Sequence, residues 1–317
     1  MNNIKPNISV VMSAYNAELY IEEAIQSILN QTFENFEFII INDGSTDNTL
    51  NLIKPYEQKD NRIILISREN KGLIASLNEG IEKAKGKYIA RMDADDISLP
   101  TRLEEQVNHM KSNDVILCGT FIELFGAESK IRKYPISDSD IRSFFIFRSP
   151  FAHPSVMMDA KIVKSIKYNK DFIHAEDYKL WAEFLQYGKA VNIAKVLLKY
   201  RITPEQITSK YGDISVEISK KVRREYINDF FIKNNIRQEV PSKILLGDIK
   251  ALQYISNSSS KSINAIRESY YLSLERYTFK TFIYFLFSFD YIYYPYSLKD
   301  FLRIIRCHIK ENREKWL

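Results

Sequence analysis

The chain has 317 residues, of which 45% are hydrophobic and 27% charged, so we expect a globular protein with one large domain or a main domain with an appendage. The formal net charge of +5 is too small to argue for a nucleic-acid partner, and the distant Cys118 and Cys307 indicate neither a disulfide framework nor a thiolate metal site. The N-terminus has no secretory signal and no apolar run approaches the roughly 18 residues that span a bilayer, so a cytoplasmic protein is expected.

The first 120 residues alternate between strand-like and helix-like patterns. Short apolar runs rich in β-branched residues predict strands at 8–13, 36–41, 63–66, 87–92 and 115–118. Helical periodicities follow the first four of these strands. Asn16 is expected to cap the first of the helices, Gly86 to end the third and Pro100 to lie in the first turn of the fourth. The alternation predicts an α/β fold with a doubly wound, mostly parallel sheet.

Beyond residue 120 the pattern is less regular. Gly126 is expected at the tip of a hairpin, a helix is predicted at 138–147, and the segment RSPFAHPSVMM is interpreted as a loop. Another helix is predicted to begin at Ala175–Asp177 and to end at Gly188, before an extended segment. Because the rest of the chain looks helical, we predict a division into two regions, residues 1–208 and a helical C-terminal region, 209–317.

Three carboxylates occupy four positions after the strand predicted at 87–92: Asp93, Asp95 and Asp96. Like charges this close repel one another, so a counter-cation is expected. Oxygen ligands of this kind suit Mg²⁺ or Mn²⁺, which bind one or two carboxylates together with substrate phosphates. The alternative is a solvated loop whose aspartates cap the next helix, and the short motif alone leaves both interpretations open.

A second polar loop, NDGSTD, follows the strand predicted at 36–41. Asp43 can accept a hydrogen bond from a ring N–H or a ribose hydroxyl, and Gly44 permits close approach of a ligand. The same residues also suit a plain turn in which Thr46 or Asp47 caps the next helix. Ligands of doubly wound sheets bind at the carboxyl ends of the strands, where both polar loops lie, so a site for a metal and a diphosphate is favoured there.

Four segments together resemble family 2 glycosyltransferases of the GT-A fold: SVVMSAYNAELYIEEAIQSILNQTFENFEFIIINDGSTDNT, ENKGLIASLNEGIEKAKGKYIARMDADD, HPSVMM and AEDYKLW. The resemblance covers residues 7 to about 208. It implies that Ala14, Tyr15 and Asp43 hold the nucleobase and ribose of a nucleotide-sugar. The DXD motif of the family matches Asp93 and Asp95, which implies that Asp93 lies near the ribose and the metal and that Asp95 ligates the metal directly.

The resemblance also implies catalytic roles further along the chain. The Glu-Asp pair of the family matches Glu176 and Asp177, and Asp177 is expected to be the general base; a helix N-terminal acid is the structural alternative. His153, Glu176 and Arg201 are candidates for contact with the acceptor or the diphosphate, although a lone histidine among apolar residues is more often structural. The Gln-x-x-Arg-Trp signature of processive members is not found here, which favours transfer of a single sugar.

The C-terminal segment predicts a basic amphipathic helix. Its cationic stripe consists of Lys299, Arg303, Arg306, Lys310 and Arg313. An apolar stripe adjoins it, and a Tyr- and Phe-rich segment at 270–296 precedes it. These features suit a helix lying on an anionic membrane surface, and a packed helical appendage is the alternative. We therefore expect a peripheral enzyme at the inner face of the cell membrane, acting on a lipid-linked acceptor of the kind that similar bacterial enzymes extend.

The resulting prediction is an inverting, Mn²⁺- or Mg²⁺-dependent glycosyltransferase. It would move one sugar from a UDP-sugar (glucose, galactose or an N-acetylated form) to a hydroxyl of a saccharide acceptor in capsule, O-antigen or lipooligosaccharide synthesis. One alternative is an inactive saccharide-binding or assembly subunit, although an idle site has no reason to hold repelling carboxylates. A second is a sugar nucleotidyltransferase, which would be expected to carry a Gly-rich basic loop where this chain has MSAYNAELY.

Overall fold

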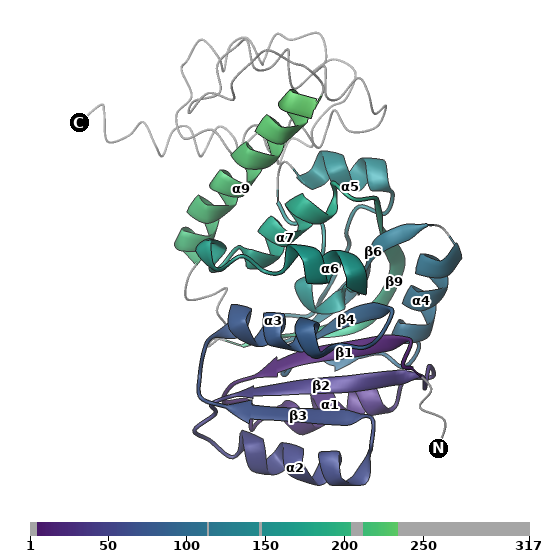
Figure 1. The fold of residues 1–317 in the computed structure, drawn as a ribbon, viewed down its shortest axis with the longest axis vertical. Coiled ribbons are helices and arrows are strands. Elements are labelled where there is room, and N and C mark those ends of the chain that lie inside the picture. Colours follow the sequence, from purple (N-terminus) through teal and green to yellow (C-terminus); the bar gives the residue numbers. More distant parts are fainter. Residues whose placement is uncertain (1–4, 113, 146–147, 204–211, 234–317) are drawn as a thin grey trace, which may run out of the picture. The chain divides into compact units, whose positions relative to one another are not determined.

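The computed structural model describes residues 5–112, 114–145, 148–203 and 212–233 (Figure 1). The chain divides into two units, 1–223 and 224–317. The first unit contains a single mixed sheet to which the nine described strands belong, in the order β3-β2-β1-β4-β8-β6-β9-β5 with β7 beside β6. This is the predicted α/β architecture. The predicted division after residue 208 stays a prediction.

Four parallel strands form the first half of the sheet: β1 (Ile8–Ala14), β2 (Phe36–Asp43), β3 (Ile63–Arg68) and β4 (Tyr88–Asp93). Nearly every residue of β1 and β2 is buried because helices cover both faces of these strands. Alternate side chains of β1 therefore serve two packing surfaces: Met12 joins the same buried cluster as the first helix, whereas Val11 lies against Gly80 on the other side.

The helices that connect these strands are α1 (Ile21–Leu29), α2 (Thr49–Lys59) and α3 (Leu73–Lys83), and α4 (Arg102–Ser112) follows the last of the four strands along the chain. In Figure 1, α3 lies on the opposite face of the sheet from α1 and α2, as right-handed crossovers require when the strand order reverses at β1.

Several predicted helix signals are wrong. Pro100 does not lie in the first turn of α4, which begins at Arg102. Asn16 does not cap α1, which begins five residues later, because its backbone is left-handed (φ 49°) and its side chain accepts a hydrogen bond from Thr46 N instead. Gly86 does not end α3, which stops at Lys83; it lies against the backbone of β1.

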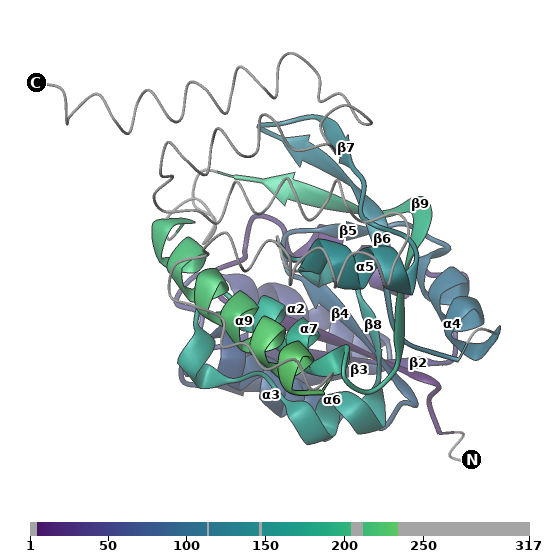
Figure 2. The ribbon, with the colours of Figure 1, turned by 90° about the horizontal axis from the view of Figure 1, so that it is seen from above.

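The second half of the sheet is mixed. It contains β8 (Met157–Asp159), β6 (Val115–Gly126), β9 (Lys189–Ile202), β5 (Ile97–Ser98) and β7 (Lys130–Arg132). β8 runs antiparallel to both β4 and β6, whereas β6 and β9 are parallel. The predicted hairpin around Gly126 is confirmed, since β6 and β7 pair antiparallel across it; the hairpin lies at the top of Figure 2. The predicted loop RSPFAHPSVMM is only partly a loop, because its end forms β8.

The remaining described elements precede or follow these strands: α5 (Asp138–Phe145), η1 (His153–Ser155), α6 (Ala160–Ile166), η2 (Lys170–Phe172), α7 (Glu176–Phe184) and α9 (Gly212–Lys233). The predicted helix at Ala175–Asp177 is confirmed as α7, but it ends at Phe184 rather than at Gly188. Among the described residues, no helix is both long and apolar enough to cross a bilayer. The predicted amphipathic helix near the C-terminus lies outside the described residues.

Candidate active site

The carboxyl ends of the parallel strands gather the first group of predicted residues. In the parallel register Ser13 lies opposite Asp93, Ala14 opposite Asn42, and Asp43 opposite Arg68. Ala14, Asp43 and Asp93 thus end neighbouring strands at one edge of the sheet, as their positions in the sequence predict.

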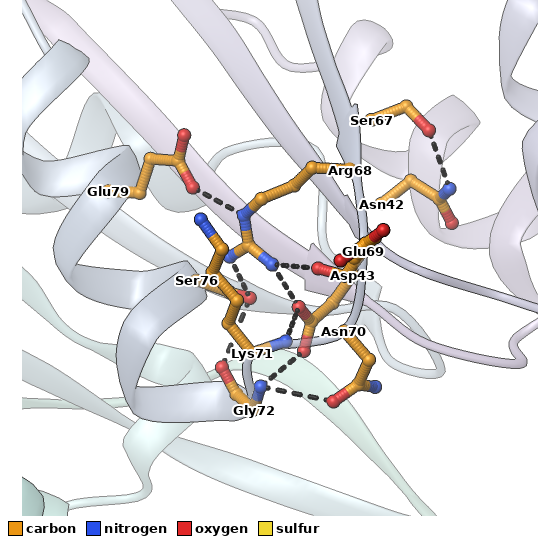
Figure 3. Close-up of polar contacts among 10 residues, drawn as sticks. All are labelled: Asn42, Asp43, Ser67, Arg68, Glu69, Asn70, Lys71, Gly72, Ser76 and Glu79. Carbon is orange, nitrogen blue, oxygen red and sulfur yellow. Dashed lines mark hydrogen bonds and ion pairs between the residues drawn. The ribbon is translucent and has the colours of Figure 1, made fainter.

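Asp43 is a nearly buried carboxylate that organises the loop between β3 and α3 (Figure 3). Its Oδ1 accepts from the backbone N–H of Lys71 over 2.8 Å and pairs with the Arg68 guanidinium, while Oδ2 accepts from the N–H of Gly72 over 3.0 Å. Arg68 in turn donates to Glu79 over 2.6 Å and to Ser76 over 2.9 Å. A carboxylate can accept about four hydrogen bonds, two on each oxygen. Because Oδ1 already has two partners and Oδ2 has one, Oδ2 of Asp43 can accept a further hydrogen bond.

Tyr15 and Asn16 continue β1 past this edge. The Tyr15 side chain is 53% exposed, so an aromatic face is presented beside the strand ends. Asn16 Oδ1 accepts from Thr46 N over 2.8 Å, and its own N–H donates to Ser45 Oγ over 3.1 Å. These bonds tie the Tyr15 segment to the turn that follows Asp43. Asp47 accepts from Thr49 N over 3.0 Å in a turn just before α2, but the N-cap of α2 is Asn48 and no side chain caps it, so the predicted capping by Thr46 or Asp47 is wrong.

The acidic turn, defined here as residues 93–96, joins β4 to β5. Asp93, Asp95 and Asp96 can each offer one carboxylate oxygen such that all three atoms lie within 4.8 Å of one another. Asp96 is 1% exposed, and its Oδ2 has no hydrogen-bond partner among the described residues. Burial, together with the charges of Asp93 and Asp95, raises the pKa of Asp96 well above its usual value. A cation among these oxygens would relieve that repulsion.

The donor set fits a hard divalent cation. All the candidate ligand atoms are carboxylate oxygens, which Mg²⁺ and Mn²⁺ prefer, and the buried unpartnered Oδ2 of Asp96 is a polar atom that the protein alone leaves unsatisfied. Asp93 and Asp95 are the predicted ligands. Asp96 is already bonded through Oδ1 to the backbone N–H of Arg201 over 2.9 Å, which supports a holding role in the turn.

Arg91 is the residue that reading the sequence missed. Its side chain is only 4% exposed, and it forms an ion pair with Asp93. A cation in an otherwise apolar strand, two residues before an acidic motif, was the available signal. Burial dominates the pKa shifts of four neighbours, and the Arg91 charge acts on each of them: it limits the rise for Asp96, Glu176 and Asp177 and adds to the lowering for His153. Arg91 therefore connects the acidic turn with the residues predicted for catalysis.

Glu176 and Asp177 form the first turn of α7. Removal from water and the adjacent charge of Glu176 raise the pKa of Asp177 from 3.8 to about 7. Burial likewise raises the pKa of Glu176. Asp177 Oδ1 accepts from the N–H of Tyr178 over 2.6 Å, which fixes the carboxylate at the helix start. A carboxylate with a pKa near neutrality is suited to accept a proton.

His153 is half-buried and hydrogen-bonded within the protein. Its Nε2 is 2.7 Å from the Tyr168 hydroxyl, and its ring meets the Trp181 ring edge-to-face with centroids 6.0 Å apart. Burial and the charge of Arg91 lower the pKa of His153 well below its usual value, so the imidazole is neutral at physiological pH. The geometry therefore gives His153 contacts within the protein, which agrees with the structural alternative weighed for it.

Arg201 ends β9 beside the acidic turn. Its Nε donates to the backbone oxygen of Asp95 over 2.8 Å, and its terminal nitrogen pairs with Glu23. The structure thus brings Arg201 to the acidic turn and engages its guanidinium with the protein, and its predicted place near the diphosphate stays a prediction.

Comparisons with known proteins agree with this architecture. The family described as Glycosyl transferase family 2 matches residues 9–165. An uncharacterised glycosyltransferase of Haemophilus influenzae is 37% identical over 96% of this chain and 97% of its own length. The O-antigen biosynthesis glycosyltransferase WbnJ of Escherichia coli is 34% identical over 70% of this chain and 92% of its own.

Two solved structures share the fold at low sequence identity. S. aureus TarS 1–349 in complex with UDP-GlcNAc has a TM-score of 0.59 and 17% identity, with 84% of each chain covered. The mannosyltransferase PcManGT of Pyrobaculum calidifontis, in complex with GDP-Man and Mn²⁺, has a TM-score of 0.52 and 14% identity, covering 92% of this chain and 82% of its own. At these identities the likeness shows the GT-A fold alone.

Proposed function

This chain belongs to glycosyl transferase family 2, a glycosyltransferase family with members in polysaccharide biosynthesis, and we propose that it transfers one sugar from a UDP-sugar to a saccharide hydroxyl with inversion of configuration. The donor is proposed to carry glucose, galactose or an N-acetylated form. The acceptor is proposed to be a lipid-linked saccharide of a surface polysaccharide, in keeping with the O-antigen role named for WbnJ.

The observation that carries this proposal is the acidic turn at the carboxyl edge of the sheet, where three carboxylate oxygens come within 4.8 Å. Asp95 and Asp93 would hold Mn²⁺ or Mg²⁺, the former being present in the PcManGT complex. When bound, such a metal neutralises charge on a nucleotide diphosphate as it leaves. The UDP-GlcNAc held by TarS supports a uridine donor, with Tyr15 and Asp43 at the base and ribose.

Asp177 is proposed to take the proton from the acceptor hydroxyl as that oxygen attacks the anomeric carbon. Its pKa of about 7 allows it to be ionised in the resting enzyme and still basic enough to accept the proton. Attack from the face opposite the leaving group inverts the anomeric centre in one displacement. Glu176 keeps the pKa of its neighbour high through its own charge.

We further propose that the protein works at the inner face of the cell membrane. The support for this is the basic and apolar stripes of the C-terminal sequence, and the lipid-linked acceptor that the proposed reaction needs. A peripheral position would bring the enzyme to an acceptor that cannot leave the bilayer.

The decisive experiment is calorimetric titration of UDP, with and without Mn²⁺, into the wild type and Asp95→Ala. We expect binding that strengthens with Mn²⁺ in the wild type and loses that gain in Asp95→Ala, because a direct ligand is removed. Asp171→Ala, which deletes an exposed carboxylate of η2, is the matched control and should behave as the wild type. Absence of UDP binding, or a metal effect that survives in Asp95→Ala, would contradict the proposal.

A further inference from the structure

The contacts of Arg201 reach the acidic turn and α1 from the end of β9. Its backbone N–H donates to Asp96 Oδ1 over 2.9 Å, and its Nε donates to the Asp95 backbone oxygen over 2.8 Å. Its terminal nitrogen pairs with Glu23, and only 14% of its side chain is exposed. Arg201 is thus bonded to two consecutive residues of the acidic turn, to the backbone oxygen of Asp95 and to the side chain of Asp96.

Two aromatic rings fix the plane of this guanidinium. Its central carbon lies 4.2 Å from the centre of the Tyr20 ring and 4.4 Å from that of Phe125. A planar guanidinium can stack on rings while its edge donates hydrogen bonds, whereas a lysine ammonium cannot do both in this geometry. The direction of the Nε–H toward Asp95 is therefore set by packing from outside the acidic turn.

β9 restrains the acidic turn both through its pairing with β5 and through the bonds from Arg201. β4 ends at Asp93, and the two-residue strand β5 begins at Ile97, which pairs with Lys199. Between these points the backbone has no strand partner in the described sheet, so the bonds from Arg201 restrain the part of the turn that carries Asp95. The side-chain directions of Asp95 and Asp96 follow from the orientation of the peptide that joins them.

We propose that Arg201 is a positioning residue that sets the metal affinity of the acidic turn, and that it does not contact the diphosphate itself. This inference rests on the proposed metal-dependent binding of a nucleotide diphosphate. It differs from the role implied by the family resemblance, which placed Arg201 at the diphosphate. Loss of a residue that orients a metal ligand typically weakens metal affinity by about 10- to 100-fold.

The test measures UDP binding to the full chain by calorimetry, first without metal and then across a series of Mn²⁺ concentrations. Arg201→Lys keeps the positive charge and the backbone bond to Asp96 but loses the planar fork. We expect the Mn²⁺ concentration for half-maximal UDP binding to rise about tenfold, while UDP affinity without metal stays as in the wild type. If Arg201 contacted the diphosphate directly, Arg201→Lys would instead weaken UDP binding even in the absence of metal. That result would overturn the inference.

Arg62→Lys is the matched control. Arg62 also pairs with a carboxylate, Asp60, over 2.7 Å and stacks on a ring, Phe36, at 4.5 Å, but it lies at the amino end of β3. Arg62→Lys should leave the Mn²⁺ concentration for half-maximal UDP binding unchanged. An equal rise of that concentration in Arg62→Lys and Arg201→Lys would show a general loosening of the protein and would overturn the inference.

A second variant keeps the test decisive if Arg201→Lys folds poorly. Glu23→Gln weakens only the ion pair between Glu23 and the terminal nitrogen of Arg201. It should raise the Mn²⁺ concentration for half-maximal UDP binding, but by less than Arg201→Lys does. An unchanged Mn²⁺ dependence in every variant that folds would sink the inference while leaving the proposed function standing. If the wild type binds no UDP with Mn²⁺, the proposed function fails, and this inference fails with it.

Discussion

Asp177 combines two properties that a general base needs, a fixed position and a pKa close to neutrality. Burial, aided by the adjacent Glu176, raises its pKa to about 7, and the nearby Arg91 limits the rise. Below that pH the carboxyl group is protonated and cannot accept the proton of the acceptor hydroxyl. We therefore expect kcat/KM to fall about tenfold for each pH unit below roughly 6 and to level off above pH 8, measured with saturating Mn²⁺. A flat profile between pH 5 and pH 8 would contradict this assignment.

The substitution Asp177→Asn separates the catalytic role from the structural one. Transfer should fall by about 10²-fold or more, because the amide cannot take a proton, while UDP affinity stays unchanged. The same substitution should make the folded protein more stable, although it lowers the activity. The folded-state pKa lies above the ordinary 3.8, so ionised Asp177 destabilises the folded protein above pH 7, and this cost disappears as pH falls toward 4.

Thermal unfolding of both proteins checks that second effect. Asp177→Asn should melt at a higher temperature than the wild type at pH 8, and the difference should shrink between pH 7 and pH 5. A variant that is less stable than the wild type at pH 8, or one that retains full transfer activity, would refute the combined assignment.

The candidate residues were predictable to different degrees. Asp43, Asp93 and Asp95 follow buried strands directly, and parallel strands bring their carboxyl ends together, so local sequence was enough to place them at one edge. The roles of Arg91 and His153 depend on contacts across distant parts of the chain, such as the hydrogen bond between His153 and Tyr168. No local pattern encodes which buried partner such a side chain meets.

At the scale of elements, the parallel half of the sheet followed from hydrophobic patterning, and the antiparallel half did not. β1 to β4 are predominantly apolar runs between clear helical periods, which is the pattern typical of buried parallel strands. β8 is three residues long and its neighbours in the sheet are not its neighbours in sequence. Its pairing is decided by tertiary packing, so the segment was interpreted as a loop.

Gly86 shows that a glycine can be required for a reason other than a helix end. A glycine after a helical period suggests a helix end, yet here a Cβ would lie 2.5 Å from Ser9 N and 2.7 Å from the carbonyl carbon of Ile8. These are backbone atoms of the central strand β1 and cannot move aside. We expect Gly86→Ala to destabilise the protein by about 1–3 kcal/mol, the usual cost of overpacking, measured as the loss in thermal or urea unfolding.

Gly188→Ala provides the comparison. The three atoms nearest to the added Cβ would there be side-chain atoms of Ile116, the closest at 3.1 Å, and a flexible side chain can shift by the few tenths of an ångström that this contact requires. The free energy of unfolding of Gly188→Ala should therefore fall much less than that of Gly86→Ala. Equal losses in the two variants would show that close approach to β1 is not the reason for the glycine.

At the scale of the whole molecule, all the site residues discussed above lie in the first compact unit, 1–223. The proposed reaction needs an acceptor as well as a donor, and no feature of the first unit's described residues explains how a lipid-linked saccharide would be reached. The C-terminal sequence offers a physical reason, since several lysines and arginines recur at helical spacing beside apolar positions. Each cation near an anionic bilayer contributes about 1 kcal/mol to binding.

We therefore predict that reversing three of these charges releases the enzyme from anionic membranes. The triple variant Arg303→Glu, Arg306→Glu and Lys310→Glu should lose most of its sedimentation with vesicles containing phosphatidylserine, and added salt should produce a similar loss in the wild type.

The matched control makes the same change in net charge at three exposed lysines of α2 and α3, as Lys54→Glu, Lys59→Glu and Lys83→Glu. If attraction between the vesicle and the protein's overall charge were responsible, both triple variants would lose binding equally. Selective loss in the C-terminal variant, with Mn²⁺-dependent UDP binding intact in both, would assign membrane contact to the C-terminal stripe and nucleotide binding to the first unit. Equal sedimentation of all three proteins would instead favour a packed appendage with a solvated basic face.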